Sequence, residues 1–396
     1  MAYADKTIRF VVGASAAVAA NTTLAVGTNF AQAARPPSGY SATEWGVALF
    51  RPYSGGAFVP GWGTHGAFAM FGHGGHSDDG TVDGVLFDFA DYTWKCLLNT
   101  NGAPHNHRAA WTPGETDGPP YYAISGTGGS VPPPYHTYRI PLGVGSDLVV
   151  PMLSYPLNPV TAAIGAWRCR LNYATQDCTW SRLTTDDVQS YYGLGGGDEE
   201  WTQAHYDATR GRVWFPSRRF AETNTLPSFR PGTDSTWTTS SYSTITTAAQ
   251  QNGSTRGNLI LDTTRDCFWC LGANGTLYRM NLANPPGSMT WASQSSTGLA
   301  SVIGADSRQS TRWHEYPVAD GGDGCFYTHT TPGVSQLAKF DPATGAFSFE
   351  TIDNGPTLPS WATAYPGHYS RFFYVPARKC FAWIPDFNLQ VYLLRP

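Results

Sequence analysis

Five of the ten histidines in the chain share a local setting in which binding chemistry is conceivable. We expect each to lie just before the first strand of a repeated unit, in the contexts GGHSD, PYHTY, QAHYD, RWHEY and PGHYS. Imidazole nitrogens gathered from separate segments could bind a metal ion or hydrogen-bond to a saccharide. We favour a structural alternative, in which each ring bonds a neighbouring backbone group and orients its loop, because repeated motifs in repeat proteins are mostly structural. The five candidates are His76, His136, His205, His314 and His368.

Aromatic residues in expected loops form the second candidate set. The chain has 14 Trp, 21 Tyr and 20 Phe, and only 14% of its residues are charged. Aromatic faces beside polar groups suit sugar rings, and low charge suits neutral glycans. The alternative is packing against a neighbouring loop or subunit. The main candidates are Trp111, Trp201 and Trp313, and the wider set adds Trp62, Tyr121, Tyr122, Tyr191 and Tyr192.

Three adjacent carboxylates, Asp198, Glu199 and Glu200, stand in the stretch GLGGGDEEW. Paired carboxylates can hydrolyse a glycoside by general acid and base catalysis. Adjacent residues on one loop rarely face each other across a substrate, so we favour a solvated turn or an occasional cation site. The sequence contains no GxSxG, HExxH or phosphate-loop motif. We therefore expect no catalytic residues.

Composition points to an all-β protein with many turns. The chain has 396 residues, with 25 Lys and Arg against 29 Asp and Glu, so its net charge is −4. This balance excludes a basic nucleic-acid binder that works by phosphate neutralisation. A hydrophobic fraction of 41% argues against disorder. The chain is rich in Gly, Pro, Trp and Thr and poor in charged residues, a composition typical of β-sheets joined by many turns.

A repeat of about 55 residues underlies the sequence. Each unit has a hydrophobic strand, an Asp or Asn turn and then an aromatic residue, which acts as a marker. A Pro- and Gly-rich insertion at about 99–134 lengthens the step from the first marker to the second. The markers are Trp94, Trp180, Trp237, Trp291 and Phe349.

A second signal predicts a tight hairpin early in each unit, where a turn is followed by a strand that opens with Cys or Val and two bulky residues. The hairpins begin at Asp207, Asp262, Asp320 and Pro376. About four short strands per unit is the size of a propeller blade. We predict six blades, with seven as the alternative because residues 1–60 are hard to parse. The sixth unit ends one strand short, so the ring would close with a strand from the N-terminal region. The predicted organisation is an N-terminal extension over 1–40, for docking, oligomerisation or ring closure, and a β-propeller over 41–396.

Residues 65–396 resemble the bacterial kelch-type proteins related to the galactose oxidase propeller. The resemblance lies in Gly74-Gly75-His76-Ser77, Val85-Leu86-Phe87-Asp88 with Trp94, His136-Thr137-Tyr138, Phe373-Tyr374-Val375-Pro376 and Val391-Tyr392-Leu393. It implies a kelch-like propeller and, as an enzymatic alternative, a copper-radical site. That family uses a cysteine cross-linked to tyrosine, an adjacent Tyr-His pair, and a further His and Tyr. Tyr135 and His136 form such a pair here, but in the same repeated setting as the other histidines, and no cysteine can be assigned to the cross-link.

The seven cysteines and the N-terminal segment bear on where the protein is made. Cys267 and Cys270 form the only close cysteine pair, and no second CxxC exists to complete a zinc site. We read most cysteines as small buried hydrophobic residues. Residues 10–33 resemble a signal peptide that ends at Ala31-Gln32-Ala33, but Asp5 and the polar run 21–23 interrupt the pattern. We expect an uncleaved extension and no membrane insertion.

These observations favour a non-enzymatic propeller used for binding or assembly. We expect a bacteriophage virion protein, of the tail or a fibre, that is made in the host cytoplasm, docks to other virion subunits through residues 1–40 and forms a homo-oligomer. It would contact a cell-surface glycan or receptor, with no nucleic-acid partner and no cofactor. The first alternative is a secreted galactose oxidase-like copper enzyme or another carbohydrate-active protein. The second is a bacterial glycan-binding lectin.

Overall fold

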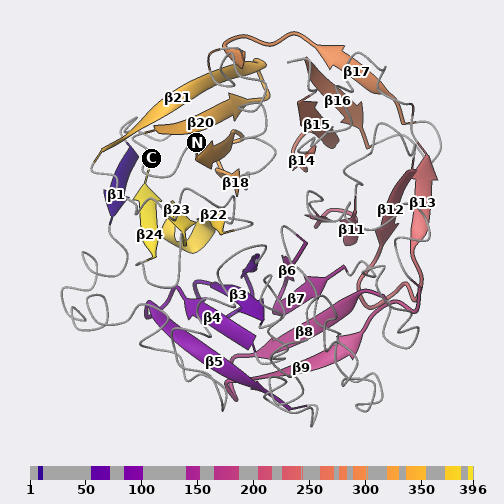
Figure 1. The fold of residues 1–396 in the computed structure, drawn as a ribbon, viewed down its shortest axis with the longest axis vertical. Coiled ribbons are helices and arrows are strands. Elements are labelled where there is room, and N and C mark those ends of the chain that lie inside the picture. Colours follow the sequence, from indigo (N-terminus) through magenta and orange to yellow (C-terminus); the bar gives the residue numbers. More distant parts are fainter. Residues whose placement is uncertain are drawn as a thin grey trace, which may run out of the picture.

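Within the residues that the structure describes, twenty-four strands arranged in a ring make up nearly all of the regular structure (Figure 1). The computed structural model describes residues 8–11, 55–71, 84–100, 140–151, 165–186, 204–215, 225–241, 243, 259–271, 276–282, 289–299, 301, 319–329, 336–353, 371–384 and 391–395. A single turn of 3₁₀ helix spans Pro376–Arg378. Within the described residues, no helix is both long enough and apolar enough to cross a membrane.

The first three blades follow one another along the chain, each a four-stranded antiparallel sheet built from inside to outside. Blade one is β2 (Ala57–Val59), β3 (Ala67–Phe71), β4 (Gly84–Asp88) and β5 (Thr93–Asn99). Blade two is β6 (Leu142–Val144), β7 (Asp147–Val150), β8 (Trp167–Asn172) and β9 (Asp177–Arg182). Blade three is β10 (His205–Asp207), β11 (Arg212–Trp214), β12 (Thr225–Phe229) and β13 (Thr238–Ser241).

The remaining blades complete the ring, and the last is built from both parts of the chain. Blade four is β14 (Leu259–Asp262), β15 (Cys267–Leu271), β16 (Leu277–Asn281) and β17 (Trp291–Gln294). Blade five is β18 (Ala319–Asp320), β19 (Phe326–His329), β20 (Gln336–Asp341) and β21 (Ala346–Asp353). Blade six is β22 (Phe372–Val375), β23 (Cys380–Trp383), β24 (Tyr392–Arg395) and, as its outermost strand, β1 (Ile8–Val11). The chain is a six-bladed β-propeller.

The aromatic markers of the sequence repeat fall on the outermost strands. Trp94 lies on β5, Trp180 on β9 and Trp291 on β17, while Phe349 lies on β21. Trp237 directly precedes β13. The hairpins predicted at Asp207, Asp262, Asp320 and Pro376 join the two inner strands of blades three to six. The predicted all-β class and six-bladed count are therefore confirmed.

The hydrophobic core is a ring of wedges between blades. The middle strands β4, β7 and β23 are buried at every position, because both faces of each sheet pack against a neighbouring blade. The outer strands alternate, as in β9, where Cys178 and Trp180 are buried and Thr179 is exposed. Each buried cluster joins adjacent blades. At the seam between blades six and one, the Phe68 and Phe373 rings stack with centroids 5.4 Å apart.

Backbone hydrogen bonds link the outer strands of neighbouring blades, and we call each such link a stitch. The residues that end one outer strand pair with those that open the next: the Thr185 N–H donates to the Ser235 carbonyl across 2.9 Å between blades two and three. The Phe347 N–H donates to the Thr297 carbonyl across 2.8 Å between blades four and five. Where the stitch becomes a short parallel ladder, two blades merge into one eight-stranded sheet, as for β5 with β9 and β21 with β1. At these seams, backbone N–H and C=O groups and not particular side chains hold the outer strands together.

Glycine allows the inner strands of blades one and two to touch. A Cβ at Gly143 on β6 would lie 1.8 Å from the Phe58 carbonyl oxygen on β2. The adjacent turns also meet, since the Gly61 N–H donates to the Gly145 carbonyl across 2.8 Å. Any side chain at Gly143 would therefore push the two blades apart.

We predict that Gly143→Ala lowers the free energy of unfolding by about 2–3 kcal/mol, because the methyl group meets rigid backbone. Gly84→Ala is the matched control. Its Cβ would meet nothing closer than the Cys178 sulfur at 3.6 Å, so the change should be neutral or slightly stabilising. Urea unfolding of the two variants measures both effects. Equal midpoints for the two variants would contradict the close approach.

Candidate functional site

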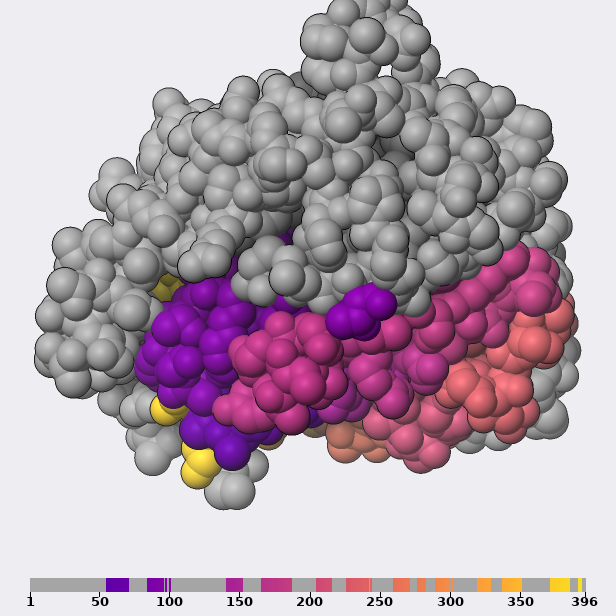
Figure 2. Space-filling view, turned by 90° about the horizontal axis from the view of Figure 1, so that it is seen from below, coloured from indigo at the N-terminus to yellow at the C-terminus, as the bar shows by residue number. Residues whose placement is uncertain are grey.

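The two ends of the ring differ in construction. Each blade runs from its inner strand outward, so the first-to-second and third-to-fourth strand turns lie at one end. We call this the turn end; its inner turns are 60–66, 145–146, 208–211, 263–266, 321–325 and 376–379. The other connections all leave from the opposite end, which we call the loop end. In the space-filling view, the described surface runs from blade one in indigo through blade two in magenta to the pink and orange of the following blades (Figure 2).

Blades three and four carry the same polar unit at the turn end. Asp207 and Asp262 close their inner strands with carboxylates that are only 1% and 2% exposed. Each accepts from an Arg three residues on and from a Trp indole seven residues on. Arg210 lies 2.8 Å from Asp207, and Arg265 lies 3.0 Å from Asp262. The indole distances are 3.5 Å from Trp214 and 3.0 Å from Trp269. The buried charge is therefore paired and hydrogen-bonded, which its burial requires.

The same arginines connect neighbouring blades. Arg210 also pairs with Asp266 in the next turn, where Nη1 lies 2.6 Å from Oδ1. Asp266 has φ +54°, a left-handed backbone that Asp tolerates better than most residues. The hydrogen bond from Arg210 holds the pKa of Asp266 below its ordinary value. Arg265 in turn reaches the Gly324 carbonyl of blade five across 3.4 Å.

Blade five departs from this unit. Asp323 stands where blades three and four have arginine, and it accepts from the Tyr327 hydroxyl across 2.8 Å. Burial raises the pKa of Asp320, and the nearby Asp262 and Asp323 raise it further. Among the residues that the structure describes, no three His, Cys, Asp or Glu side chains gather into a group that could hold a metal ion. These carboxylates therefore provide no metal site within that set.

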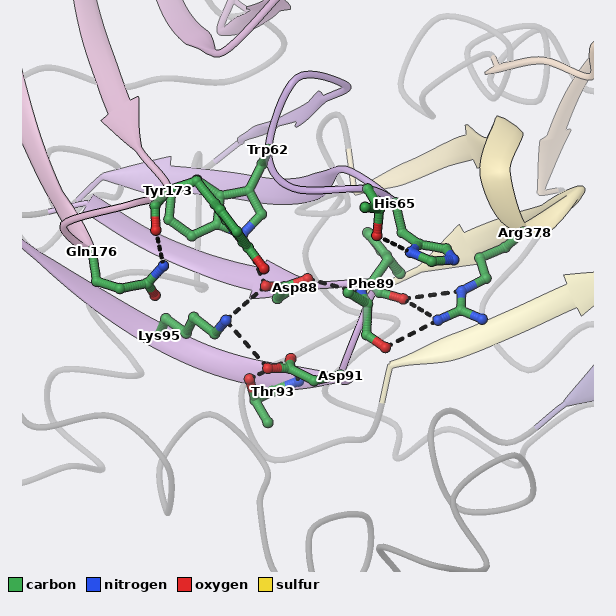
Figure 3. Close-up of polar contacts among 12 residues, drawn as sticks. Trp62, His65, Asp88, Phe89, Asp91, Thr93, Lys95, Tyr173, Gln176 and Arg378 are labelled. Carbon is green, nitrogen blue, oxygen red and sulfur yellow. Dashed lines mark hydrogen bonds and ion pairs between the residues drawn. The ribbon is translucent and has the colours of Figure 1, made fainter.

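Blade one uses lysine in place of arginine (Figure 3). Asp88, 1% exposed, accepts from the Trp62 indole across 2.9 Å and from the Lys95 ammonium across 2.7 Å. Lys95 also lies 3.2 Å from Asp91. Burial acts to lower the pKa of Lys95, but the two carboxylates outweigh it and raise the pKa. Tyr173 of blade two packs edge-on against Trp62 and is 48% exposed.

Blade six reaches the same region from the other side. The Arg378 guanidinium donates to the Phe89 carbonyl across 2.6 Å and to the Ala90 carbonyl across 3.1 Å. It also lies over the Tyr92 ring, 4.8 Å from the centroid. Figure 3 shows Arg378 and Lys95 on opposite sides of the 89–91 turn. At the turn end, Arg210, Arg265 and Arg378 therefore each bind a group of a neighbouring blade, whereas Lys95 pairs with two carboxylates of its own blade.

Most residues proposed from sequence lie outside the described residues. His205 is the exception among the histidines: it opens β10, is buried, and packs edge-on against Phe268 of blade four. The other four histidines fall in connections between strands, and the strand ends on both sides of each connection lie at the loop end. Those outside the described set are His76, His136, His314, His368, Trp111, Trp201, Trp313, Tyr135 and the acidic run 198–200.

The structure bears on three interpretations of the sequence. Trp62 was offered as a loop aromatic for which core packing is a poorer explanation, with packing against a neighbouring loop as the alternative; its side chain is fully buried and its indole N–H is bound by Asp88, so it belongs to the packing. His76 was grouped with residues that precede a blade's first strand, but it falls between β3 and β4, inside blade one. The cysteine interpretation agrees with the structure at six positions, where the thiols are reduced: Cys325 is partly buried, and the buried ones are Cys169, Cys178, Cys267, Cys270 and Cys380.

The polar side-chain contacts at the turn end, within a blade and between neighbouring blades, were not predicted. Their signal is an Asp followed by Arg at the third position and Trp at the seventh, which the sequence shows at Asp207 and Asp262. That spacing indicates the pairing within a blade. It does not indicate that Arg210 also reaches Asp266, since the seam geometry fixes that contact.

Comparison with known proteins adds little to this geometry. No protein-family model matches the sequence, and no curated protein matches it. The chain is similar to a crystal structure of a protein of unknown function from Bacteroides thetaiotaomicron, with 11% identity, a TM-score of 0.44, and coverage of 86% of this chain and 68% of that one. It is also similar to YCF48 from Cyanidioschyzon merolae, with 9% identity, a TM-score of 0.40, and coverage of 87% and 84%. The propeller assignment therefore rests on the sheets of this chain.

We predict that Asp266→Asn weakens the protein in a pH-dependent way. The depressed pKa means that the ionised carboxylate stabilises the fold above the ordinary value of 3.8, and this contribution is lost as the pH falls through the lower folded value. Asn keeps the left-handed backbone and removes only the charge. Because Asp266 is 39% exposed, the loss at pH 7 should be at most about 1 kcal/mol and should shrink near pH 3. Urea unfolding at both pH values measures it, and an equal loss at each would rule out the charge as cause.

A second prediction compares two lysines. Lys95→Met leaves the buried Asp88 without its cation and should cost about 2–3 kcal/mol. Lys339→Met is the matched control, since Lys339 pairs at 3.1 Å with Glu350, which is 24% exposed, and should cost less than about 1 kcal/mol. Thermal unfolding of both variants provides the comparison. A larger loss for Lys339→Met would mean that carboxylate burial does not set the cost.

Proposed function

We propose that this protein is a non-enzymatic binding propeller whose loop end contacts a cell-surface glycan or receptor. The observation that carries the proposal is the difference between the two ends. At the turn end, Asp88, Asp207 and Asp262 are buried and each is paired with a cation of its own blade, and two of these cations, Arg210 and Arg265, also bind the next blade. The loop end receives the connections that carry the proposed histidines other than His205 and the main candidate tryptophans; these are His76, His136, His314, His368, Trp111, Trp201 and Trp313. A rigid base with long connections at one end is a common basis for ligand binding.

The distribution of the candidates supports one binding face. Trp111 and His136 fall between blades one and two, Trp201 between blades two and three, and Trp313 with His314 between blades four and five. Because the flanking strands end at the same rim, side chains from separate blades can contact one ligand. Tryptophan faces and imidazoles suit a glycan with alternating apolar and hydroxylated surfaces.

We further propose that the protein is a virion component, of a bacteriophage tail or fibre. β1 lies before Ala31-Gln32-Ala33, so cleavage there would remove the fourth strand of blade six. This supports an uncleaved extension and speaks against the secreted alternatives. The reduced state of the six described thiols suits synthesis in a reducing host cytoplasm. Residues 8–11 belong to the ring, so docking to other virion subunits would fall to residues 12–40.

The enzymatic alternative is a galactose oxidase-like copper enzyme. It would follow from the kelch-type resemblance, and its weak metal candidates are Tyr135 and His136, between β5 and β6. The second alternative, a bacterial glycan-binding lectin, shares the binding face and differs only in the absence of an assembly partner. Deleting residues 12–40 while keeping β1 separates the lectin from the virion protein, since only the latter would lose its assembly partners.

We predict that the purified protein binds members of an array of bacterial lipopolysaccharides and capsular polysaccharides. Trp111→Ala, Trp201→Ala or Trp313→Ala should each weaken binding by at least about tenfold, which corresponds to 1.4 kcal/mol, if the ring stacks on a sugar. Tyr173→Ala, at the turn end, is the exposed-aromatic control and should bind normally. Normal binding by all three tryptophan variants would refute the aromatic face. A native mass spectrum with one bound copper would overturn the non-enzymatic proposal.

A further inference from the structure

The outermost strand of blade six is separated in sequence from the rest of its blade. β1 supplies this strand from residues 8–11, whereas the other three strands come from the last part of the chain. β1 pairs antiparallel with β24 in the register Arg9↔Arg395, Phe10↔Leu394 and Val11↔Leu393. Figure 1 shows β1 in indigo between the yellow β24 and the orange β21. Any chain segment in this position would make the same backbone bonds.

Blade five contributes to the same position. β21 pairs with its own neighbour β20 only as far as Thr351, opposite Gln336. Its last two residues continue and pair in parallel with β1, in the register Ile352↔Ile8 and Asp353↔Arg9. β1 therefore lies in a slot with a strand edge on each side. The slot is defined by the edge of β24 and by residues 352–353 of β21.

The connection after β1 is much longer than the ring needs. Residues 12–56 join β1 to β2, the inner strand of the next blade. The equivalent step from β13 to β14 uses residues 242–258, so the connection after β1 is more than twice as long. A longer tether lowers the effective concentration of the chain's own strand at the slot. Fully extended, residues 12–56 would reach about 150 Å, so they could also reach the slot of a second molecule.

We propose that the slot accepts residues 8–11 of a second copy of this chain, and that reciprocal exchange of β1 gives a two-fold symmetric dimer. Both forms contain the same strand pairs, so protein concentration sets the balance between them. Reciprocal exchange fills the slot of each molecule, so the outer edge of β24 is paired in both. The exchange depends on β1, β21 and β24 alone and does not rest on glycan binding.

A cysteine pair at the slot distinguishes exchange from self-closure. Phe10→Cys combined with Leu394→Cys places two thiols at partner positions of the β1–β24 ladder. After oxidation and denaturing electrophoresis without reductant, strand exchange gives a covalent dimer whose fraction rises with protein concentration. Cross-links confined to single chains at every concentration would overturn the proposal.

Three controls exclude other sources of a covalent dimer. Each single cysteine variant should give no covalent dimer on the same denaturing gel after oxidation, which excludes disulfides with native thiols. Lys339→Cys with Ser348→Cys places a pair at partner positions of β20 and β21, within one chain, and should cross-link only internally. A dimer formed equally by this pair would show random collision between chains.

A second measurement needs no cysteine and covers the case in which the paired variant misfolds. Native mass spectrometry of the unmodified chain should show a dimer that grows with concentration. Deleting residues 18–40 leaves a connection still longer than residues 242–258, so β1 can reach its own slot with a higher effective concentration. The dimer fraction should then fall at least about fivefold. An unmodified chain that is monomeric at all concentrations, or a dimer unchanged by the deletion, would refute strand exchange.

Discussion

Each blade has two apolar faces, and only neighbouring blades can cover them. The middle strands β4, β7 and β23 are buried at every position, so a single blade would expose a hydrophobic sheet on both sides. A ring is the arrangement in which every blade has two neighbours. Closure is therefore the condition on which the other features depend. It makes the four residues of β1 important beyond their number, because they complete the blade that meets both the first and the fifth.

The polar side chains divide between the two ends in a way that follows from this packing. Inner turns converge at the turn end, where carboxylates such as Asp207 and Asp262 become buried and must be neutralised. The arginines that neutralise them also cross the seams, so one side chain both satisfies a buried charge and positions the next blade. Groups committed in this way have little capacity left for a ligand. We therefore assign the proposed ligand binding to the loop end, where the connections can vary in length and composition without disturbing the packing between blades.

The sequence predicted those parts of the fold that side chains determine. The aromatic period revealed the outer strands because bulky residues such as Trp94, Trp180 and Trp237 are buried there between blades, although Phe349 on β21 is exposed. A turn followed by a strand that opens with Cys or Val and two bulky residues likewise revealed the inner hairpins of blades three to six. The burial of Trp62 could not be read from its place in a turn, because it depends on how that turn folds over β4 and β5, where Asp88 binds the indole. The stitches between outer strands could not be predicted, since backbone groups leave no pattern in a sequence.

Backbone stitching also explains how the repeat can be degenerate while its sheets stay regular. Blade five has lost the arginine found in blades three and four and has Asp323 in its place. Its seam with blade four still holds, because Arg265 reaches the Gly324 carbonyl and the Thr297 stitch remains. Its seam with blade six is filled by the Tyr327 and Phe381 rings, 4.9 Å apart. A side chain at one seam can therefore change as long as another tie and the backbone pairs persist. This freedom lets the blades diverge in sequence without opening the ring.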